Sequence, residues 1–347
     1  MSQIPEIVLS GPPRERGRAH GEALRGLIGE TIDRWYHHLA TTIDPDRVIR
    51  EVAGDVGFLK AAQSYTPHLV EEVQGIAEGS GQRFETMFAW QLIDEVWWYI
   101  DELLGEVKPR ERCSALAINH RGVGWVAQTQ DLPRHLDGGQ VLLRYRDEDG
   151  LEILAPSIAG LLALNGVNRQ GFAACITTLS QLGHVTTGLS SGFIVPELLR
   201  CRSVEDALSF LSRVPIASGN SFLFGTATRS AGVEVSADGM TPVGTTDRVL
   251  HTNHALVMDP VFDYVRFTGS VERFGQLDAD VRPDSSRAGL EAVYREFPIC
   301  RVRESDDASI SVGTMLFELG PEPLCHFAPG PLATDELATY RFETENR

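Results

Sequence analysis

The sequence has few cysteines, no long apolar run and no excess of positive charge, and each of these absences excludes a class of protein. The five cysteines are an odd number at wide spacings without a C-x-x-C pair, which argues against a disulfide framework and a thiolate zinc site. No stretch approaches the roughly 18 apolar residues of a transmembrane helix, and the first residues lack the regions of a signal peptide. We therefore expect a reduced, cytoplasmic protein without a membrane partner.

Acidic residues outnumber basic residues by 48 to 31, which gives a formal net charge of −17. Clustered Lys and Arg are needed to neutralise phosphates, so this balance disfavours a nucleic-acid partner. The hydrophobic fraction of 42% is ordinary for a globular protein, and 347 residues suffice to bury a substantial core. Composition thus predicts a globular protein and leaves its function to the motifs.

The predicted secondary structure changes character near residue 110. Apolar residues at spacings of three to five predict a helix over 14–43, and further helices are predicted over 66–81 and 83–104. After residue 112 the pattern favours strands joined by short turns, with helical sections at 193–213 and about 265–296. No repeat or long linker divides the chain. This order predicts an α+β fold of packed layers.

A hairpin is predicted around NHRG, with strands at 113–118 and 123–130, and its first strand begins at Cys113. A cysteine in this place is ordinarily a small buried apolar residue. Taken alone, Cys113 therefore predicts no chemistry.

GLSSG, residues 188–192, matches the G-x-S-x-G nucleophile elbow with Ser190 as the serine. That motif needs a buried strand leading directly into the serine, whereas here a polar loop precedes a helix. In that setting Ser190 or Ser191 would serve as an N-cap. A serine hydrolase that uses Ser190 with His251 or His254 stays open as an alternative.

His251 and His254 in HTNH are three residues apart and would bind a metal ion together from one face of a helix. The surrounding sequence predicts a strand that runs into a turn, which places the two side chains on opposite faces. No carboxylate or cysteine lies near enough in the sequence to complete a metal signature. We expect neither a metal ion nor a cofactor.

Several segments spread along the whole chain form one ordered pattern. They are GPPRERGRAHGEAL, EEVQGIAEGSG, CSALAINHRGVGWVAQTQDL, GVNRQGFAACITTL, VLHTNHAL, FPICR and GTMLFEL. This ordered set resembles the acyl-coenzyme A:6-aminopenicillanic acid acyltransferase family, the C45 group of N-terminal-nucleophile (Ntn) hydrolases. The resemblance runs from about residue 11 to residue 345, and HTNH with FPICR is its most specific part.

The resemblance implies a four-layer αββα sandwich and a precursor that cleaves itself between Arg112 and Cys113. Residues 1–112 would then form a helical small subunit, and residues 113–347 the catalytic large subunit of one structural domain. The freed α-amino group has a pKa of about 8 beside a thiol of about 8.5, so the nucleophile would carry its own general base. Its substrate would be a small N-acyl amide or acyl thioester, and Cys113 would form the acyl-enzyme.

The same resemblance assigns supporting roles. Asp131 would organise the new ammonium group, and Asn253 would donate its side-chain N–H to the tetrahedral oxyanion. Arg301 in FPICR matches an arginine linked to processing or substrate positioning. Asn220 matches a small polar residue of the site.

Two positions depart from the family pattern. Arg112 stands where the fungal prototype has glycine, and Ala115 replaces a hydroxyl residue near the nucleophile. Both keep open an unprocessed relative that only binds a small ligand. For an enzyme, we expect hydrolysis rather than coenzyme A-dependent transfer, because many relatives need only water as acceptor and no phosphate-cradling glycine-rich motif occurs here.

Overall fold

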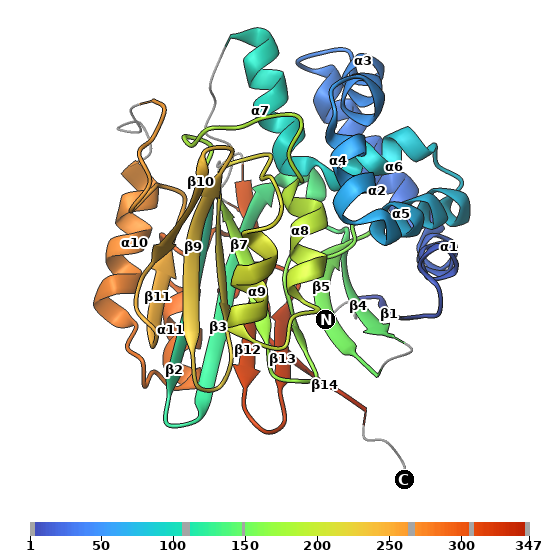
Figure 1. Cartoon of the computed structure of the whole chain (residues 1–347). Coiled ribbons are helices and arrows are strands. Elements are labelled where there is room, and N and C mark those ends of the chain that lie inside the picture. Colours follow the sequence, from blue (N-terminus) through green and yellow to red (C-terminus); the bar gives the residue numbers. More distant parts are fainter. Residues whose placement is uncertain (1–3, 106–111, 148–149, 263–267, 305–308, 344–347) are drawn as a thin grey trace.

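The computed structural model describes residues 4–105, 112–147, 150–262, 268–304 and 309–343 (Figure 1). Its helices are α1 (Pro13–Ala23), α2 (Arg25–Ala40), α3 (Pro45–Arg50), α4 (Phe58–Tyr65), α5 (Pro67–Ser80), α6 (Phe84–Gln91), α7 (Ile93–Leu104), α8 (Ser191–Leu198), α9 (Val204–Leu211), α10 (Thr268–Asp280) and α11 (Arg287–Arg295). A π-helical turn covers Glu51–Asp55 and a 3-10 turn covers Arg134–Leu136. No helix in these ranges is long and apolar enough to cross a membrane.

The strands form two sheets. They are β1 (Glu6–Ser10), β2 (Arg112–His120), β3 (Val123–Pro133), β4 (Gln140–Arg146), β5 (Glu152–Ile158), β6 (Gly166–Asn168), β7 (Ala173–Thr178), β8 (Asn220–Gly225), β9 (Ser230–Ser236), β10 (Gly239–Val243), β11 (Arg248–His251), β12 (Ser309–Leu319), β13 (Leu324–Ala328) and β14 (Ala338–Arg341). The eight-stranded sheet has the order β1-β4-β5-β6-β7-β8-β9-β10, and the six-stranded sheet the order β11-β2-β3-β12-β13-β14. β1 and β4 run parallel, while the other pairings between the named strands in the described ranges are antiparallel.

Three apolar clusters hold the sheets and helices together. One joins helices α2–α9 to the eight-stranded sheet and includes Trp90 and Leu143. A second contains Leu142 and Phe317 and therefore joins the two sheets. The third joins the six-stranded sheet to α10 and α11 and includes Leu290. Neighbouring Leu142 and Leu143 belong to different clusters because side chains alternate along a strand. In Figure 1, α10 lies on the left of the sheets and α1–α6 on the upper right.

The predicted hairpin is confirmed as β2 and β3. Its two turn residues, Arg121 and Gly122, have φ angles of 49° and 83°. Positive φ at both central residues is the signature of a type I′ turn, whose twist matches that of the flanking strands. The turn sets a register in which Cys113 lies opposite Gln130 and Arg112 opposite Asp131.

Two predicted helices are each two helices in the structure. The segment 14–43 breaks at Leu24, between α1 and α2, and the segment 83–104 breaks at Leu92, between α6 and α7. Both leucines are buried, so the apolar periodicity continues across the breaks. Periodicity therefore predicted the buried faces, but it carried no signal for the change of direction.

Close contact with α5 explains the separate course of α1. A Cβ atom on Gly17 of α1 would lie 2.0 Å from the carbonyl oxygen of Glu72, and one on Gly75 of α5 would lie 2.1 Å from that of Arg14. Only glycine allows the two backbones to approach so closely. α1 must therefore follow α5, and the chain turns before α2 begins.

The remaining helix predictions hold with finer boundaries. Helix α5 starts at Pro67 and ends before Gly81, whose φ of 77° is left-handed. The section 193–213 contains α8 and α9, and Ser203 caps α9 by accepting a hydrogen bond from the Asp206 amide. The section 265–296 contains α10 and α11 within its described part. Segregated helices and largely antiparallel sheets confirm the α+β class.

Candidate active site

Cys113 is the second residue of β2 and lines a pocket at that end of the strand. The thiol residue is 5% exposed. The pocket encloses roughly 540 Å³, including the solvent at its mouth. Its lining comes from α6, α7, α8, β2, β3, β7 and the loop after β5: Gln91, Ile93, Asp94, Cys113, Gln128, Gln130, Leu132, Leu161, Leu164, Ile176, Thr178, Ser191, Gly192 and Val195. The predicted nucleophile is therefore at a cavity rather than in the closed core.

Asn253 lies directly against the backbone of Cys113. The Cys113 nitrogen donates to Asn253 Oδ1 at 2.6 Å. Asn253 Nδ2 donates to the carbonyl oxygen of Thr178 at 3.1 Å, and its own backbone amide donates to Ser270 Oγ at 2.8 Å. The structure thus brings together Cys113 and Asn253, which are 140 positions apart in the sequence.

Arg273 on α10 is a site residue that sequence reasoning missed. Its Nη1 donates to the carbonyl oxygen of Cys113 and, at 2.9 Å, to Ser114 Oγ, while its Nη2 donates to Asn253 Oδ1 at 2.9 Å. The side chain is fully buried. An arginine in an ordinary amphipathic helix carries no sequence signal, so only the packing of α10 against the six-stranded sheet identifies it.

Asp131 lies beside Cys113 in the ladder but faces away from the pocket. It is opposite Arg112, whereas Gln130 is opposite Cys113 and lines the pocket. Because side chains alternate along β3, the Asp131 carboxylate lies on the sheet face covered by α10 and α11. Ser311 Oγ donates to Asp131 Oδ1 at 2.6 Å. Asp131 is therefore placed near the backbone at the start of β2 rather than in the substrate pocket.

Arg301 joins the Asp131 group from the segment after α11. Its Nε lies 3.9 Å from Asp131 Oδ2, and its backbone amide donates to Ser311 Oγ at 3.0 Å. Arg301 is 5% exposed and Asp131 is fully buried, so this ion pair is shielded from water. Three predicted residues, Cys113, Asp131 and Arg301, thus lie around the start of β2.

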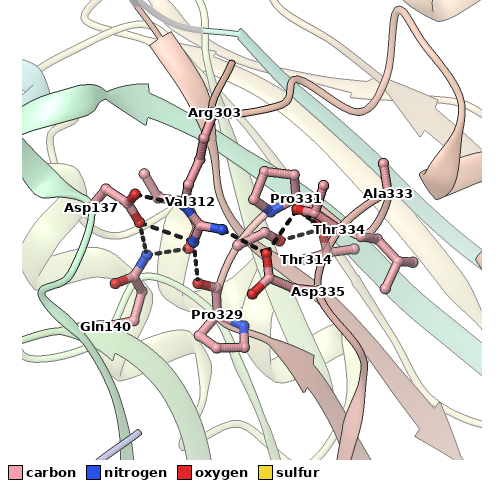
Figure 2. Close-up of polar contacts among 12 residues, drawn as sticks. Asp137, Gln140, Arg303, Val312, Thr314, Pro329, Pro331, Ala333, Thr334 and Asp335 are labelled. Carbon is pink, nitrogen blue, oxygen red and sulfur yellow. Dashed lines mark hydrogen bonds and ion pairs between the residues drawn. The ribbon is translucent and has the colours of Figure 1, made fainter. Parts of the chain in front are cut away.

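Figure 2 shows how the segment that carries Arg301 is held two residues further along. Arg303 donates to both carboxylate oxygens of Asp137, at 2.7 and 3.2 Å, and to Asp335 Oδ2 at 2.7 Å. Gln140 donates to Asp137 as well, at 2.9 Å. Burial by itself raises the pKa of Asp137, but the hydrogen bonds from Arg303 and Gln140, with the Arg303 charge, outweigh burial and hold the pKa below its usual value. This ionised pair fixes the chain next to Arg301.

Asn220 lies in a second polar group on the other side of the pocket. It pairs with Thr178 across β7 and β8, and its Nδ2 donates to Ser218 Oγ at 3.0 Å. Ser218 Oγ in turn donates to Glu95 Oε1 at 2.7 Å. Glu95 also accepts from the backbone amide of Ser191 at 2.9 Å. The structure therefore ties Asn220 to Glu95 of α7, which the sequence did not single out.

The wall formed by α7 is acidic. Asp94 lines the pocket and accepts a hydrogen bond from Thr178 Oγ1 at 2.9 Å. Glu95 is fully buried, and its burial, with the nearby charge of Asp94, raises its pKa to about 7. Removing a carboxylate from water disfavours its charged form, which is the cause of the upward shift.

Ser190 and the histidines do not form a catalytic group in the described part of the chain. Ser190 is the N-cap residue of α8, but its hydroxyl makes no capping hydrogen bond. His251 Nε2 is paired with Glu234 Oε1 at 2.9 Å, and His254 Nδ1 with Ser270 Oγ at 2.8 Å. Burial lowers the pKa of His254 to about 4. Both rings therefore have partners other than Ser190.

The two histidines of HTNH also serve separate structural groups. Glu234 accepts from the backbone amides of Leu256, Val257 and Met258 besides His251, so the pair orders the chain after Asn253. Within the described residues there is no group of three or more His, Cys, Asp or Glu side chains that could hold a metal ion.

Comparison with known proteins adds to this geometry. The sequence model of the acyl-coenzyme A:6-aminopenicillanic acid acyl-transferase family matches residues 119–296, just over half of the chain. The chain belongs to this family. The matched segment includes Asp131, Asn220 and Asn253; it begins after Cys113 and ends before Arg301. Because the family is named for an acyl-transferase, the chain belongs to a family of enzymes. The match also confirms the resemblance found in the sequence.

Individual relatives are distant. The acyl-coenzyme A:6-aminopenicillanic-acid-acyltransferase 40 kDa form of Emericella nidulans is 23% identical over 259 residues, which is 72% of this chain and 69% of that protein. Penicillin V acylase from Agrobacterium tumefaciens is 16% identical with a TM-score of 0.42, covering 66% of this chain and 86% of its own. A variant of conjugated bile acid hydrolase from Clostridium perfringens is 13% identical with a TM-score of 0.42, covering 67% and 97%.

Proposed function

We propose that the protein is a self-processing amidohydrolase that cleaves a small N-acyl amide through an acyl-enzyme on Cys113. The observation that carries the proposal is the position of Cys113, which lines a pocket while its nitrogen contacts the side chain of Asn253. Cleavage of the Arg112–Cys113 bond would turn that nitrogen into an α-amine at the same place. An amine beside a thiol supplies the base that a mid-chain amide lacks.

In the proposed reaction the α-amine takes the thiol proton, and the sulfur attacks the amide carbonyl carbon. The carbonyl oxygen becomes an oxyanion, the C–N bond breaks, and the leaving amine takes the proton from the α-ammonium group. Water then attacks the thioester, which releases the carboxylic acid and restores the thiol. Acylation therefore uses the Cys113 thiol as nucleophile and deacylation uses water, while the Cys113 α-amine carries the proton in both steps.

Asn253 is our proposed oxyanion donor. Its side-chain amide has two N–H groups, and the bond to Thr178 uses one of them. Loss of such a donor typically costs about 3 kcal/mol of transition-state stabilisation. Arg273, held between Cys113 and Asn253, would orient the amide and favour deprotonated forms of the neighbouring amine and thiol.

Asp131, Arg301 and Asn220 are proposed as positioning groups. Asp131 and Arg301 would fix the backbone where the new amino terminus forms, since both lie around the start of β2. Asn220 would hold Thr178 and the pocket wall beside Asn253.

We also propose the four-layer Ntn arrangement for this chain. The three apolar clusters support it, because they join helices to one sheet, the two sheets to each other, and the second sheet to α10 and α11. Residues before Cys113 supply β1, which pairs with β4, and six of the eight helices (α2–α7) in the apolar cluster that joins α2–α9 to the eight-stranded sheet. The segments 1–112 and 113–347 would therefore stay associated after cleavage.

The intact mass of freshly purified protein under denaturing conditions tests the proposal. We expect two species that sum to the 38.1 kDa chain plus one water, the larger beginning at Cys113. A Cys113→Ala variant should remain one species. Uncleaved wild-type protein without amidase turnover would overturn the proposal and favour the ligand-binding alternative.

The acceptor is tested separately on the processed protein. We expect water as acceptor, so an N-acyl amide should be hydrolysed at a rate that added coenzyme A does not change. Formation of an acyl-coenzyme A product, or turnover that requires an acyl-coenzyme A donor, would replace hydrolysis by acyl transfer at the same cysteine.

A further inference from the structure

The segment that carries Asn253 begins where a strand ladder ends. β11 is the edge strand of the six-stranded sheet, and its last residue, His251, pairs with Ala115 of β2. Two residues further along, Asn253 reaches the level of Cys113 and accepts a hydrogen bond from its nitrogen at 2.6 Å. Because the ladder ends at His251, side-chain contacts have to fix the backbone of Asn253.

Two side chains from other elements anchor the backbone around Asn253. Ser270 of α10 accepts a hydrogen bond from the Asn253 amide at 2.8 Å. Glu234 of β9 accepts from the three backbone amides of residues 256–258, at 2.5 to 3.1 Å, and contacts His251 Nε2 at 2.9 Å. Glu234 therefore holds the chain both before and after Asn253.

Both ring nitrogens of His251 face groups that accept hydrogen bonds. Nδ1 lies 2.8 Å from the carbonyl oxygen of Thr252, with Thr177 Oγ1 at 3.2 Å, and because a carbonyl only accepts, Nδ1 carries a proton. Nε2 lies 2.9 Å from Glu234 Oε1. An ionised Glu234 would require a proton on Nε2 as well, which makes the ring an imidazolium ion.

The contacts of Glu234 are those of an ionised carboxylate. Three backbone amides direct their N–H groups at its two oxygens, and an amide N–H cannot accept the proton of a carboxylic acid. Burial by itself raises the pKa of Glu234, but the hydrogen bonds from His251 and from the Leu256 and Met258 amides outweigh burial and hold the pKa below its usual value. His251 and Glu234 are both fully buried, and buried charges of this kind are stable only when they are paired.

Other ionisable groups on the surrounding elements leave this pair intact. His254 is neutral at pH 7, because burial and the nearby charges of His251 and Arg273 lower its pKa to about 4. Cys175 of β7 stays a neutral thiol, since burial raises its pKa. Arg273 of α10 is a second cation and cannot replace His251 as an anion's partner without leaving its own bonds to Cys113 and Asn253.

We propose that His251 is a positioning residue that acts as an imidazolium ion. Its ion pair with Glu234 fixes the segment in which Asn253 contacts Cys113. This inference rests on the proposed function, because it supports the role of Asn253 at the oxyanion. A neutral ring keeps one donor, so either the Thr252 carbonyl or Glu234 would lose its bond, and the segment would hold Asn253 less firmly.

Nuclear magnetic resonance of protein labelled with 15N at histidine tests the charge without any turnover. At pH 7 we expect both ring nitrogens of His251 to have the chemical shifts of protonated nitrogens. The signals of His251 are identified by their loss in the His251→Gln variant. One unprotonated ring nitrogen of His251 at pH 7 would overturn the inference.

Kinetic variants separate the charge of the ring from its packing. His251→Gln keeps a neutral donor, so kcat for an N-acyl amide should fall about 10–10²-fold while KM stays within about threefold. His251→Lys restores a cation beside Glu234 and should recover at least about fivefold of the lost kcat. Equal kcat values for the two variants would overturn the inference.

His326→Gln is the matched control for this substitution. His326 is also fully buried, and its Nε2 lies 3.5 Å from Glu318 Oε2, but it is outside the pocket. We expect its kcat to equal that of wild type. A loss as large as that of His251→Gln would show that removal of any buried histidine lowers activity, which would overturn the specific role of His251.

Hydrogen exchange keeps the inference separate from the proposed function. The backbone amides of residues 256–258 should exchange at least about tenfold faster in His251→Gln than in wild type, and at an intermediate rate in His251→Lys. If wild-type protein cleaves nothing, the proposed function fails, while exchange and the histidine spectra still decide whether the ion pair fixes this segment. Unchanged exchange in His251→Gln would overturn the inference even where Cys113-dependent cleavage is found.

Discussion

The strand side of the Cys113 pocket places two buried arginines, Arg273 and Arg301, around the start of β2, whereas the helical side presents Asp94 with Glu95 behind it. Arg301 is paired with Asp131, and Arg273 donates to oxygens of Cys113, Ser114 and Asn253. We infer from this difference in charge that the two sides of the pocket have different functions. We propose that positive charge near Cys113 favours its thiolate and the oxyanion formed during the reaction.

The two sides also come from different parts of the chain. Cys113, Asn253 and Arg273 all follow the proposed cleavage point, whereas Asp94 and Glu95 precede it. Chemistry would therefore lie in the large subunit and recognition partly in the small one. The following predictions separate these contributions, beginning with the largest expected effect.

Replacing Cys113 by alanine should remove the proposed nucleophile from the strand side of the pocket. We expect amide cleavage to fall by at least about 10⁴-fold, since loss of a covalent nucleophile has effects of this order or larger. Steady-state kinetics with an acyl p-nitroanilide measure it. Cys201→Ala is the matched control, because Cys201 is partly exposed and outside the pocket. Activity of Cys113→Ala within tenfold of wild type would contradict the assignment.

Asn253→Ala should lower kcat by about 10²–10³-fold with little change in KM, because an oxyanion exists in the transition state and not in the bound substrate. Kinetics over a range of substrate concentrations separate the two constants. Asn119→Ala serves as the control, since Asn119 hydrogen-bonds at the far end of the hairpin. A rise in KM at unchanged kcat would instead make Asn253 a substrate-binding residue.

Arg273→Met should lower kcat/KM by roughly 10–10²-fold and move the acidic limb of its pH profile upward. Without the cation, the Cys113 amine and thiol would lose their protons at higher pH. Arg273→Lys keeps the charge but cannot reach all three acceptors, so it should restore the pH profile more than the rate. Arg282→Met, at a residue whose contacts are at the end of α10, controls for loss of an arginine. An unmoved profile would leave Arg273 a purely structural role.

Glu95→Gln, on the helical side of the pocket, should have the smallest effect. We expect it to change how the stability of the folded protein depends on pH. The folded-state pKa of Glu95 is raised from 4.5 to about 7, so the folded protein binds more protons than the unfolded chain between these values. Wild-type stability from this group is therefore present below about pH 4.5 and is lost as pH rises towards 7. The glutamine variant, which can still accept from Ser191 and Ser218, should melt a few degrees higher than wild type at pH 8 and equally at pH 5.

Thermal melts at the two pH values check this, with Glu22→Gln as a control because Glu22 is largely exposed. A variant that is less stable than wild type at pH 8 would mean that Glu95 is held ionised by its partners. In that case the helical side would carry two charges beside the pocket rather than one.

What the sequence determined by itself is local or is carried by family motifs. The β2–β3 hairpin, the start of α5 at Pro67 and the cap of α9 at Ser203 follow from short-range rules of turns and helix ends. The ordered motifs predicted the family and nominated Cys113 and Asn253, which the structure brings into contact.

Only the tertiary structure decided the rest. The breaks at Leu24 and Leu92 depend on how α1 packs against α5 and how α6 and α7 turn, and an apolar period does not record direction. Arg273 contacts Cys113 across 160 positions, and Asp94 reaches Thr178 across 84. Neither residue type nor spacing marks such pairs, because long-range contacts are set by the packing of whole elements rather than by neighbouring residues.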